Sequence, residues 1–110
     1  MSKFDEKVAQ YRAAMDKLGI SYTVGKFEAV TKACGPSIYN KDAETVSSSD
    51  QAEMDRVKNN YLKKKLGLTD SDDLDGIVQY AVDKMGASNR NKYRAIFYYL
   101  CSHKAGKFPG

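Results

Sequence analysis

The residues best suited to bind a charged ligand lie near the C-terminal end of the 110-residue chain. Arg90 and Arg94 are four residues apart and come shortly after Ser88 and Asn89. Serine and asparagine are favoured N-cap residues, so Ser88 or Asn89 is expected to begin a helix that carries both arginines in its first turns, on one face. The free backbone N–H groups of a helix start favour an anion. These four residues therefore form a candidate anion-binding site.

Two interpretations of this candidate site remain open. Arginines at a helix N-terminus are unfavourable for the helix dipole unless a negative charge compensates them. In the interpretation that we favour, the negative charge is a carboxylate of the same chain, provided by Asp72, Asp73 or a glutamate. In the other, it is a phosphate or another anionic ligand that binds at the helix start.

The other reactive side chains do not form a catalytic or metal-binding set. His103 is the only histidine, and Cys101, two residues before it, would face away from it on a helix, so we expect no metal site. Cys34 is followed by Gly-Pro-Ser, which is similar to a thioredoxin-like active site without its second cysteine. A helix that ends at Gly-Pro explains the same residues. No glycine-rich phosphate loop occurs, and we expect no cofactor.

Apolar residues at helical spacing predict five helices. These cover approximately residues 3–18, 24–33, 50–66, 70–85 and 88–104. The second half of the last predicted helix, around Phe97 and Leu100, is apolar on most sides, as is typical of a central helix. Residues 34–49 show no clear period and are predicted to form one long loop, anchored by Ile38 and Tyr39. Strand signals are nearly absent, so the predicted fold is all-α, a compact array of about five helices.

Length and composition predict one domain over residues 1–110, with residues 106–110 as a frayed tail. No segment approaches the roughly 20 apolar residues of a membrane span, and the first residues lack the apolar region of a signal peptide. We therefore expect a soluble protein of the cytoplasm without a membrane partner. Cys34 and Cys101 are expected to be reduced thiols there.

Positive charge is concentrated at the C-terminal end. The net charge is +4, and no acidic residue follows Asp83, whereas six cationic residues do. These are Lys84, Arg90, Lys92, Arg94, Lys104 and Lys107. Such a segment could bind an anionic partner, including nucleic acid with Tyr98 or Tyr99 as a stacking platform. It could equally pack beside acidic residues of its own chain, which we consider the simpler interpretation.

Two long motifs and two shorter ones resemble a known family. Residues 35–46 read GPSIYNKDAETV, residues 88–95 read SNRNKYRA, residues 1–4 read MSKF and residues 64–68 read KKLGL. In these segments the chain resembles a small bacterial family known as domain of unknown function 2853. The resemblance implies an all-helical, soluble bacterial protein, and it implies no activity, cofactor or catalytic residue.

The residues together favour a non-enzymatic binding or protein-interaction module. We expect its contact surface to combine the long loop with the basic end of the last helix. The residues proposed for this surface are Tyr39, Asn40, Lys41, Lys92 and Tyr98. Binding of nucleic acid or of an anionic ligand is the first alternative. The second is an enzyme that uses the acidic residues at positions 70–75, although acids are also common at helix starts for electrostatic reasons.

Overall fold

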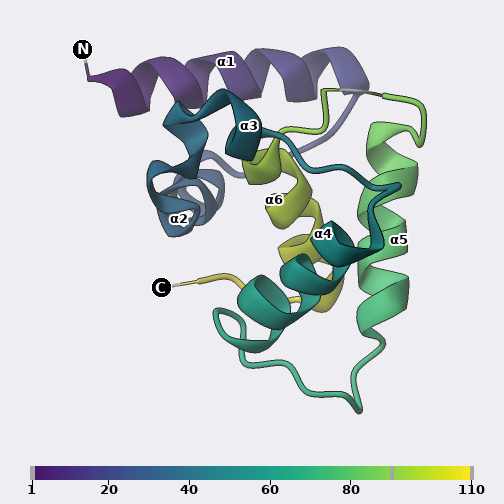
Figure 1. Cartoon of the computed structure of the whole chain (residues 1–110). Helices are drawn as coiled ribbons and strands as arrows, with labels where there is room; N and C mark the ends of the chain where they lie inside the picture. Colours follow the sequence, from purple (N-terminus) through teal and green to yellow (C-terminus); the bar gives the residue numbers. More distant parts are fainter. Residues whose placement is uncertain (1, 90, 110) are drawn as a thin grey trace.

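The computed structural model describes residues 2–89 and 91–109, and in these residues the regular structure is helical (Figure 1). The elements are α1 (Lys3–Leu18), α2 (Val24–Ala33), η1 (Gly35–Tyr39), α3 (Lys41–Glu44), α4 (Gln51–Arg56), η2 (Val57–Lys63), α5 (Leu74–Met85) and α6 (Arg94–Ala105). One isolated antiparallel bridge joins Thr45 to Tyr93. The predicted all-α fold is confirmed. Among the described helices, none is long and apolar enough to cross a membrane.

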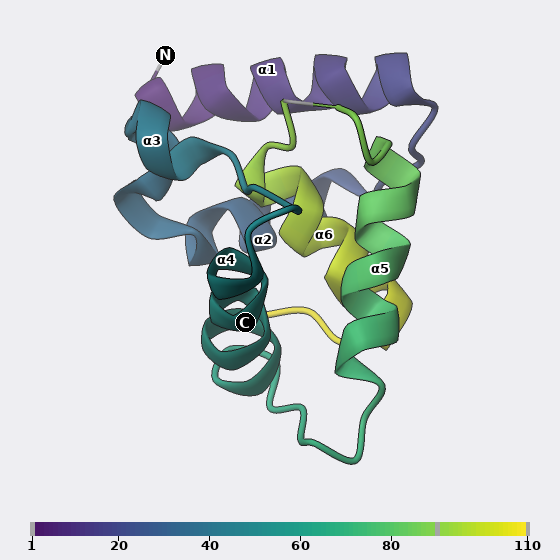
Figure 2. The same cartoon turned by 45° about the vertical axis from the view of Figure 1, so that its right-hand side comes forward.

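Helix α6 lies at the centre of the molecule, between α5 on one side and α2 on the other (Figures 1 and 2). Every residue from Ala95 to Ser102 is buried, which covers more than two turns of the helix on all sides. Helix α1 crosses one end of α6, and η2 packs against its side. The prediction of a central last helix is therefore confirmed, and its apolar residues join one core shared by all the longer helices.

Helix α1 begins and ends as its sequence predicts. The Ser2 hydroxyl accepts a hydrogen bond from the backbone N–H of Asp5, and Gly19 ends the helix with a φ of 71°, a left-handed conformation that glycine adopts without strain. Tyr11 and Met15 are fully buried. Leu18, the last residue of the predicted apolar stripe, is instead 38% exposed, because the helix end extends past the core.

The prediction of one long loop over residues 34–49 is wrong, because this segment contains two short helical elements. Pro36 lies in the first turn of the 3₁₀ helix η1, where its missing N–H costs no hydrogen bond. The Asn40 side chain then accepts a hydrogen bond from the N–H of Asp42 and caps α3. Ile38 is buried, as predicted for an anchor, whereas Tyr39 is 48% exposed.

Helix α4 continues without a break into η2, a π-helical stretch. Its wider turn brings the adjacent residues Tyr61 and Leu62 into the core together. The Tyr61 ring stacks on Tyr98 of α6 with 4.1 Å between centroids, and its hydroxyl lies 2.6 Å from the Ser102 hydroxyl. The segment predicted as one helix from 50 to 66 is thus tied to α6 by a stacked ring and a buried hydrogen bond.

Helix α6 begins at Arg94, five residues later than Asn89 and not at Ser88 or Asn89 as predicted. The reason is that the Asn89 side chain hydrogen-bonds the end of α5 and does not cap α6. Its Nδ2 donates to the Met85 carbonyl, and its Oδ1 accepts from the N–H of Asn91. Tyr93, the residue before α6, forms the isolated bridge with Thr45.

The residues after α6 do not fray in the way that the sequence predicts. Gly106 caps the helix in a left-handed conformation, and the N–H of Lys107 donates to the Ser102 carbonyl. The Phe108 ring then packs on Tyr99, with 5.5 Å between the centroids. An aromatic side chain thus fixes the tail against the core as far as the structure describes it.

Shortening a buried side chain of the central helix α6 should lower the stability of the fold. Phe97 and Leu100 are 0% and 3% exposed, so Phe97→Ala and Leu100→Ala should each lower the free energy of unfolding by about 2–5 kcal/mol through cavity formation. Urea denaturation followed by far-ultraviolet circular dichroism measures this loss. Val24→Ala, at a 38% exposed position, is the control and should change stability little. Losses below about 1 kcal/mol for both core variants would contradict the central position of α6.

Candidate functional site

The Arg94 guanidinium connects three elements. Its Nε donates to the Ala43 carbonyl at 2.7 Å, its Nη1 to the Tyr98 hydroxyl at 2.9 Å and its Nη2 to Glu53 Oε1 at 2.6 Å. The Arg94 and Glu53 side chains are only 14% and 9% exposed. The other oxygen of Glu53 accepts from Arg56. Of the two interpretations of the arginines, Arg94 therefore follows the first, an ion pair with a glutamate of its own chain.

The surroundings of Glu53 keep its carboxylate charged. Burial acts to raise the pKa of Glu53, but the hydrogen bonds from Arg56 and Arg94 outweigh it, so that the pKa lies below its usual value. The pKa of Arg94 is raised, because Tyr98 and Glu53 outweigh the opposing effect of burial. Both partners are therefore ionised at neutral pH, and the pair is a structural element of the α4–α6 contact.

Arg94 does not lie with the other residues of the predicted anion site. Ser88 and Asn89 line a separate hollow, whereas Arg94 lines a small hollow with Cys34, Tyr61 and Tyr98. Arg90, the fourth residue of the prediction, lies outside the described residues. Because α6 begins at Arg94, the predicted helix start with two arginines on one face does not form.

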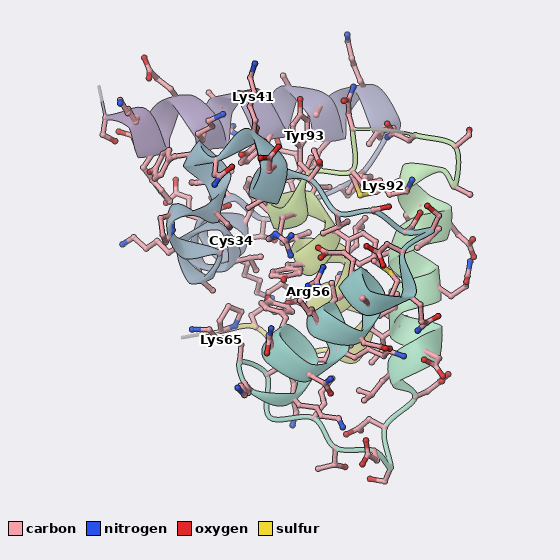
Figure 3. The ribbon with its side chains drawn as sticks, viewed as in Figure 1. Cys34, Lys41, Arg56, Lys65, Lys92 and Tyr93 are labelled. Carbon is pink, nitrogen blue, oxygen red and sulfur yellow. The ribbon has the colours of Figure 1, made fainter. Side chains whose placement is uncertain are left out.

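Lys92 is buried, although the sequence places it on the predicted contact surface. It is 3% exposed, and its Nζ donates to the carbonyls of Ala87 at 2.9 Å and Asn89 at 2.6 Å. Burial lowers the pKa of Lys92. The side chain lies at the upper end of α5, beside the chain that follows α3 (Figure 3). There it lines a hollow of about 530 Å³ together with hydroxyl groups of Ser47, Ser49 and other residues.

The remaining residues of the predicted contact surface divide into exposed and buried ones. Tyr39, Asn40 and Lys41 are exposed at the η1–α3 junction. Tyr98 is 8% exposed and stacks on Tyr61, so it is part of the core. Of the five residues predicted for the contact surface, the three loop residues are therefore exposed, and Lys92 and Tyr98 are buried.

Two hollows lie along α1, next to these exposed loop residues. The first, of about 320 Å³, is lined by Lys3, Glu6, Lys7, Gln10 and Tyr39. The second, of about 340 Å³, is lined by Gln10, Ala13, Ala14, Lys17, Leu18, Asn89, Asn91 and Tyr93. Gln10 lines both, and its Nε2 donates to the Tyr93 hydroxyl at 3.2 Å. The two hollows therefore follow one another along α1, with Gln10 between them, and together we call them the α1 groove.

Glu44 fixes α3 beneath the α1 groove. Its Oε2 accepts hydrogen bonds from the Tyr11 hydroxyl at 2.5 Å and from Lys7 Nζ at 2.9 Å. Burial raises the pKa of Tyr11, and the hydrogen bond to Glu44 raises it further. The Tyr11 ring packs against Tyr93 at 5.0 Å. These contacts fix Tyr93, which lines the second hollow, and the η1–α3 segment, whose Tyr39 lines the first.

Four of the described cationic residues of the C-terminal segment lie in three different places. Lys84 and Lys104 both lie over the ring of Tyr80, at 5.8 Å and 5.4 Å, and Lys92 and Arg94 are buried in different places. Tyr99 is 4% exposed, and its hydroxyl accepts from the N–H of Thr23. Neither Tyr98 nor Tyr99 is therefore available as a stacking platform for a base.

The cysteines have the environment of core thiols. Burial raises the pKa of Cys34 to about 12, although Arg94 acts in the opposite direction, and burial also raises the pKa of the fully buried Cys101. Cys34 ends α2 and precedes the five-residue 3₁₀ helix η1, so a helix and not a strand leads into it and the thioredoxin-like arrangement does not form. His103 is exposed and stacks on Tyr80. In residues 2–89 and 91–109, no three His, Cys, Asp or Glu residues are placed to hold a metal ion.

The acidic residues at positions 70–75 form local contacts around the start of α5. Asp73 caps the helix by accepting from the N–H of Gly76, and Asp72 accepts from the N–H of Thr69. Asp70 pairs with Lys63 at 2.6 Å, and Asp75 pairs with Lys58 at 2.7 Å. The helix-start explanation therefore accounts for the acids that the enzyme hypothesis would use.

Sequence reasoning missed the two buried glutamates. The sequence predicts a carboxylate partner for the arginines only as Asp72, Asp73 or an unspecified glutamate, and Glu44 is not among its candidate site residues. Both glutamates join elements far apart in the chain, 41 residues for Glu53 with Arg94 and 33 for Glu44 with Tyr11. No local pattern reports such pairs, although an arginine near a predicted helix start signals that a carboxylate must be near.

Comparison with known proteins identifies a family. The family described as "Protein of unknown function (DUF2853)" matches residues 10–108, which include both long motifs of the resemblance completely and all of the residues that line the second hollow of the α1 groove. No curated protein matches this sequence.

Removal of the Glu53 carboxylate should destabilise the fold strongly. In Glu53→Gln the buried Arg94 loses its counter-charge, and we expect the free energy of unfolding at pH 7 to fall by about 3–5 kcal/mol. Because the pKa of Glu53 is lowered in the folded state, its contribution is complete above the unfolded pKa of roughly 4.3 and is lost as the pH falls through the lower folded value.

Urea denaturation of both proteins between pH 3 and pH 7 tests this expectation, with Glu28→Gln on the exposed side of α2 as the control. The difference between wild type and Glu53→Gln should shrink toward the acidic end, whereas Glu28→Gln should follow the wild type throughout. A Glu53→Gln variant as stable as wild type at pH 7 would show that the ion pair does not hold α4 to α6.

Proposed function

The chain belongs to the DUF2853 family, whose function is unknown, and we propose that it is a non-enzymatic module that binds a segment of another protein in the α1 groove. The observation that carries this proposal is the groove itself. It extends along α1 from the exposed Tyr39 in the first hollow to the exposed Leu18 in the second, and Gln10 lines both hollows. Tyr93, labelled in Figure 3, lies beside α1 and forms part of its wall.

The lining of the α1 groove suits one kind of partner. Its second half combines the small side chains of Ala13 and Ala14 with Leu18 and Tyr93, so an apolar face can approach the helix closely. Lys3 and Lys17 line it with a single acid, Glu6, whereas Lys7 is already paired with Glu44. An amphipathic segment with apolar residues on one face and acidic residues along its edges is complementary to this surface.

The groove is also held in a rigid form, which favours binding. Glu44 joins Tyr11 and Lys7 to α3, and the isolated bridge joins Tyr93 to Thr45, the residue that follows α3. A surface that keeps one shape before binding loses less conformational entropy when a partner docks. Of the predicted contact residues, Tyr39 lines the first hollow and Asn40 and Lys41 follow it in the chain, so the proposal retains the exposed half of the surface expected from the sequence.

The environment of the reactive side chains supports a binding role over an enzymatic one. A nucleophilic thiol needs a lowered pKa, and burial gives Cys34 a raised pKa instead. The acidic residues around α5 are engaged in a helix cap and ion pairs.

We further propose that this is a bacterial protein located in the cytoplasm, which the family resemblance and the two unpaired cysteines support.

The experiment compares charge-introducing variants within and outside the groove. Leu18→Glu and Ala14→Glu place a carboxylate where the proposed partner is itself apolar or acidic, and each should abolish binding of a partner segment. Val24→Glu is the matched control, because Val24 is as exposed as Leu18 but lies outside the groove on α2. Partners captured from a bacterial lysate with wild type and each variant are identified, and the binding segment is then titrated as a synthetic peptide.

The proposal requires a peptide that binds wild type and Val24→Glu equally and loses at least tenfold in affinity for both groove variants. Binding that survives both groove variants would overturn it. If the captured partner is a second copy of this chain, the groove is a self-association surface and the proposal of an acidic partner segment is wrong. Sedimentation at increasing protein concentration detects this self-association.

A further inference from the structure

Lys92 is a buried cation that lacks an anionic partner among the described residues. It is 3% exposed, and no carboxylate of the described chain lies within 4 Å of its Nζ, whereas Arg94 has Glu53 and Lys7 has Glu44. The carbonyls of Ala87 and Asn89 accept two of its three N–H bonds but carry no net charge. A buried charge without a counter-charge is unfavourable, and burial indeed lowers the pKa of this lysine.

The hollow beside Lys92 offers further hydrogen-bond donors. It has a volume of about 530 Å³, the size of a small-molecule site, and its lining includes several hydroxyl groups. These belong to Thr45, Ser47, Ser48, Ser49 and Ser88. They come from two segments that approach each other from either side, the chain after α3 and the chain after α5. Within the described part of the chain, the backbone N–H groups of Ser48 and Ser49 have no acceptor.

We propose that this hollow binds the phosphoryl group of a small phosphorylated molecule, with Lys92 as the charge that recognises it. A lysine ammonium is a point charge suited to phosphate, and hydroxyl and amide donors from two directions match its tetrahedral oxygens. The hollow is wider than a bare ion needs, so it can hold the organic part of the ligand as well. This site includes Ser88 and Asn89 of the anion site expected from the sequence but uses Lys92 as its cation.

Asp42 is the one acid among the residues that line this hollow, and it provides a sensitive test. It is exposed and repels an anion without taking part in its recognition. Replacement by asparagine removes the repulsion while the cap formed by the Asn40 side chain stays in place. Replacement of a residue that only supports the fold is expected to weaken binding or to leave it unchanged. Removal of a nearby negative charge is expected to strengthen the binding of an anion, so the direction of the change is informative.

The experiment is an NMR titration of the isotopically labelled protein at pH 7.5. The probes are inorganic phosphate and glycerol phosphate, with sodium chloride at matched ionic strength as the reference. Saturable shifts of the backbone amides of residues 47–49 and of Ser88 are expected with both probes and not with chloride. Tighter binding of glycerol phosphate identifies a phosphorylated small molecule as the ligand, and equal binding identifies free phosphate.

Four variants connect these shifts to the site. Lys92→Met should lower the affinity for phosphate at least tenfold, and Ser88→Ala should lower it several-fold. Asp42→Asn should raise it about threefold, since one repelling charge is removed. Ser21→Ala, an exposed serine outside the hollow, should leave it unchanged. Because Lys92→Met also removes two hydrogen bonds to the chain after α5, the surface variants Ser88→Ala and Asp42→Asn test the proposal if that protein does not fold.

The proposal fails if millimolar phosphate produces no saturable shift in these amides. It fails equally if Ser88→Ala and Asp42→Asn bind phosphate with the affinity of wild type. The result is independent of the α1 groove, because none of the four substituted residues lines it.

Discussion

The arrangement of this protein depends on the buried pair of Arg94 and Glu53. Helix α6 is apolar on nearly every side, and apolar contacts alone would allow the neighbouring helices to slide along it. The Arg94 guanidinium removes this freedom because its three hydrogen bonds fix α4, α3 and Tyr98 at one level of the helix. Since α3 leads to the wall of the α1 groove and α6 begins where the bridge to Thr45 ends, both candidate sites are positioned by this one residue.

The sequence predicted the structure of those segments whose conformation depends on local interactions. The apolar spacing predicted the bounds of α1 and the end of α5 at Met85, although α5 begins at Leu74 and not near residue 70, and the all-apolar second half of α6 predicted its central place. It was insufficient where a side chain has two possible uses. Asn89 is a good N-cap by type, yet it hydrogen-bonds backward to Met85, which moves the start of α6 to Arg94. An asparagine can cap the start of the next helix with its oxygen or bond the end of the preceding helix with its nitrogen. The sequence is the same in both cases, and only the tertiary contacts decide which bond forms.

The candidate sites were harder to predict because charge in the sequence does not show which charges reach the surface. Six cations after Asp83 suggested a basic patch, but folding places Arg94 against Glu53, Lys92 against backbone carbonyls, and two lysines over Tyr80. The α1 groove could not be read from the sequence either, because its walls come from α1, η1 and the residues before α6. What the sequence did indicate was the importance of the segments at 35–46 and 88–95, which border both proposed sites.

The wide turn of η2 also fixes a length of chain. A π-helical stretch is equivalent to one residue inserted into an α-helix, and here the extra residue allows Tyr61 and Leu62 to face the core side by side. Deletion of one of the exposed Asn59 and Asn60 would restore α-helical geometry and rotate the following residues by about 100°. Either the stacked ring of Tyr61 or the buried Leu62 would then leave the core. Evolution can therefore exchange the exposed side chains of this segment freely, but an insertion or deletion between Asp50 and Gly67 must be compensated within the same helix.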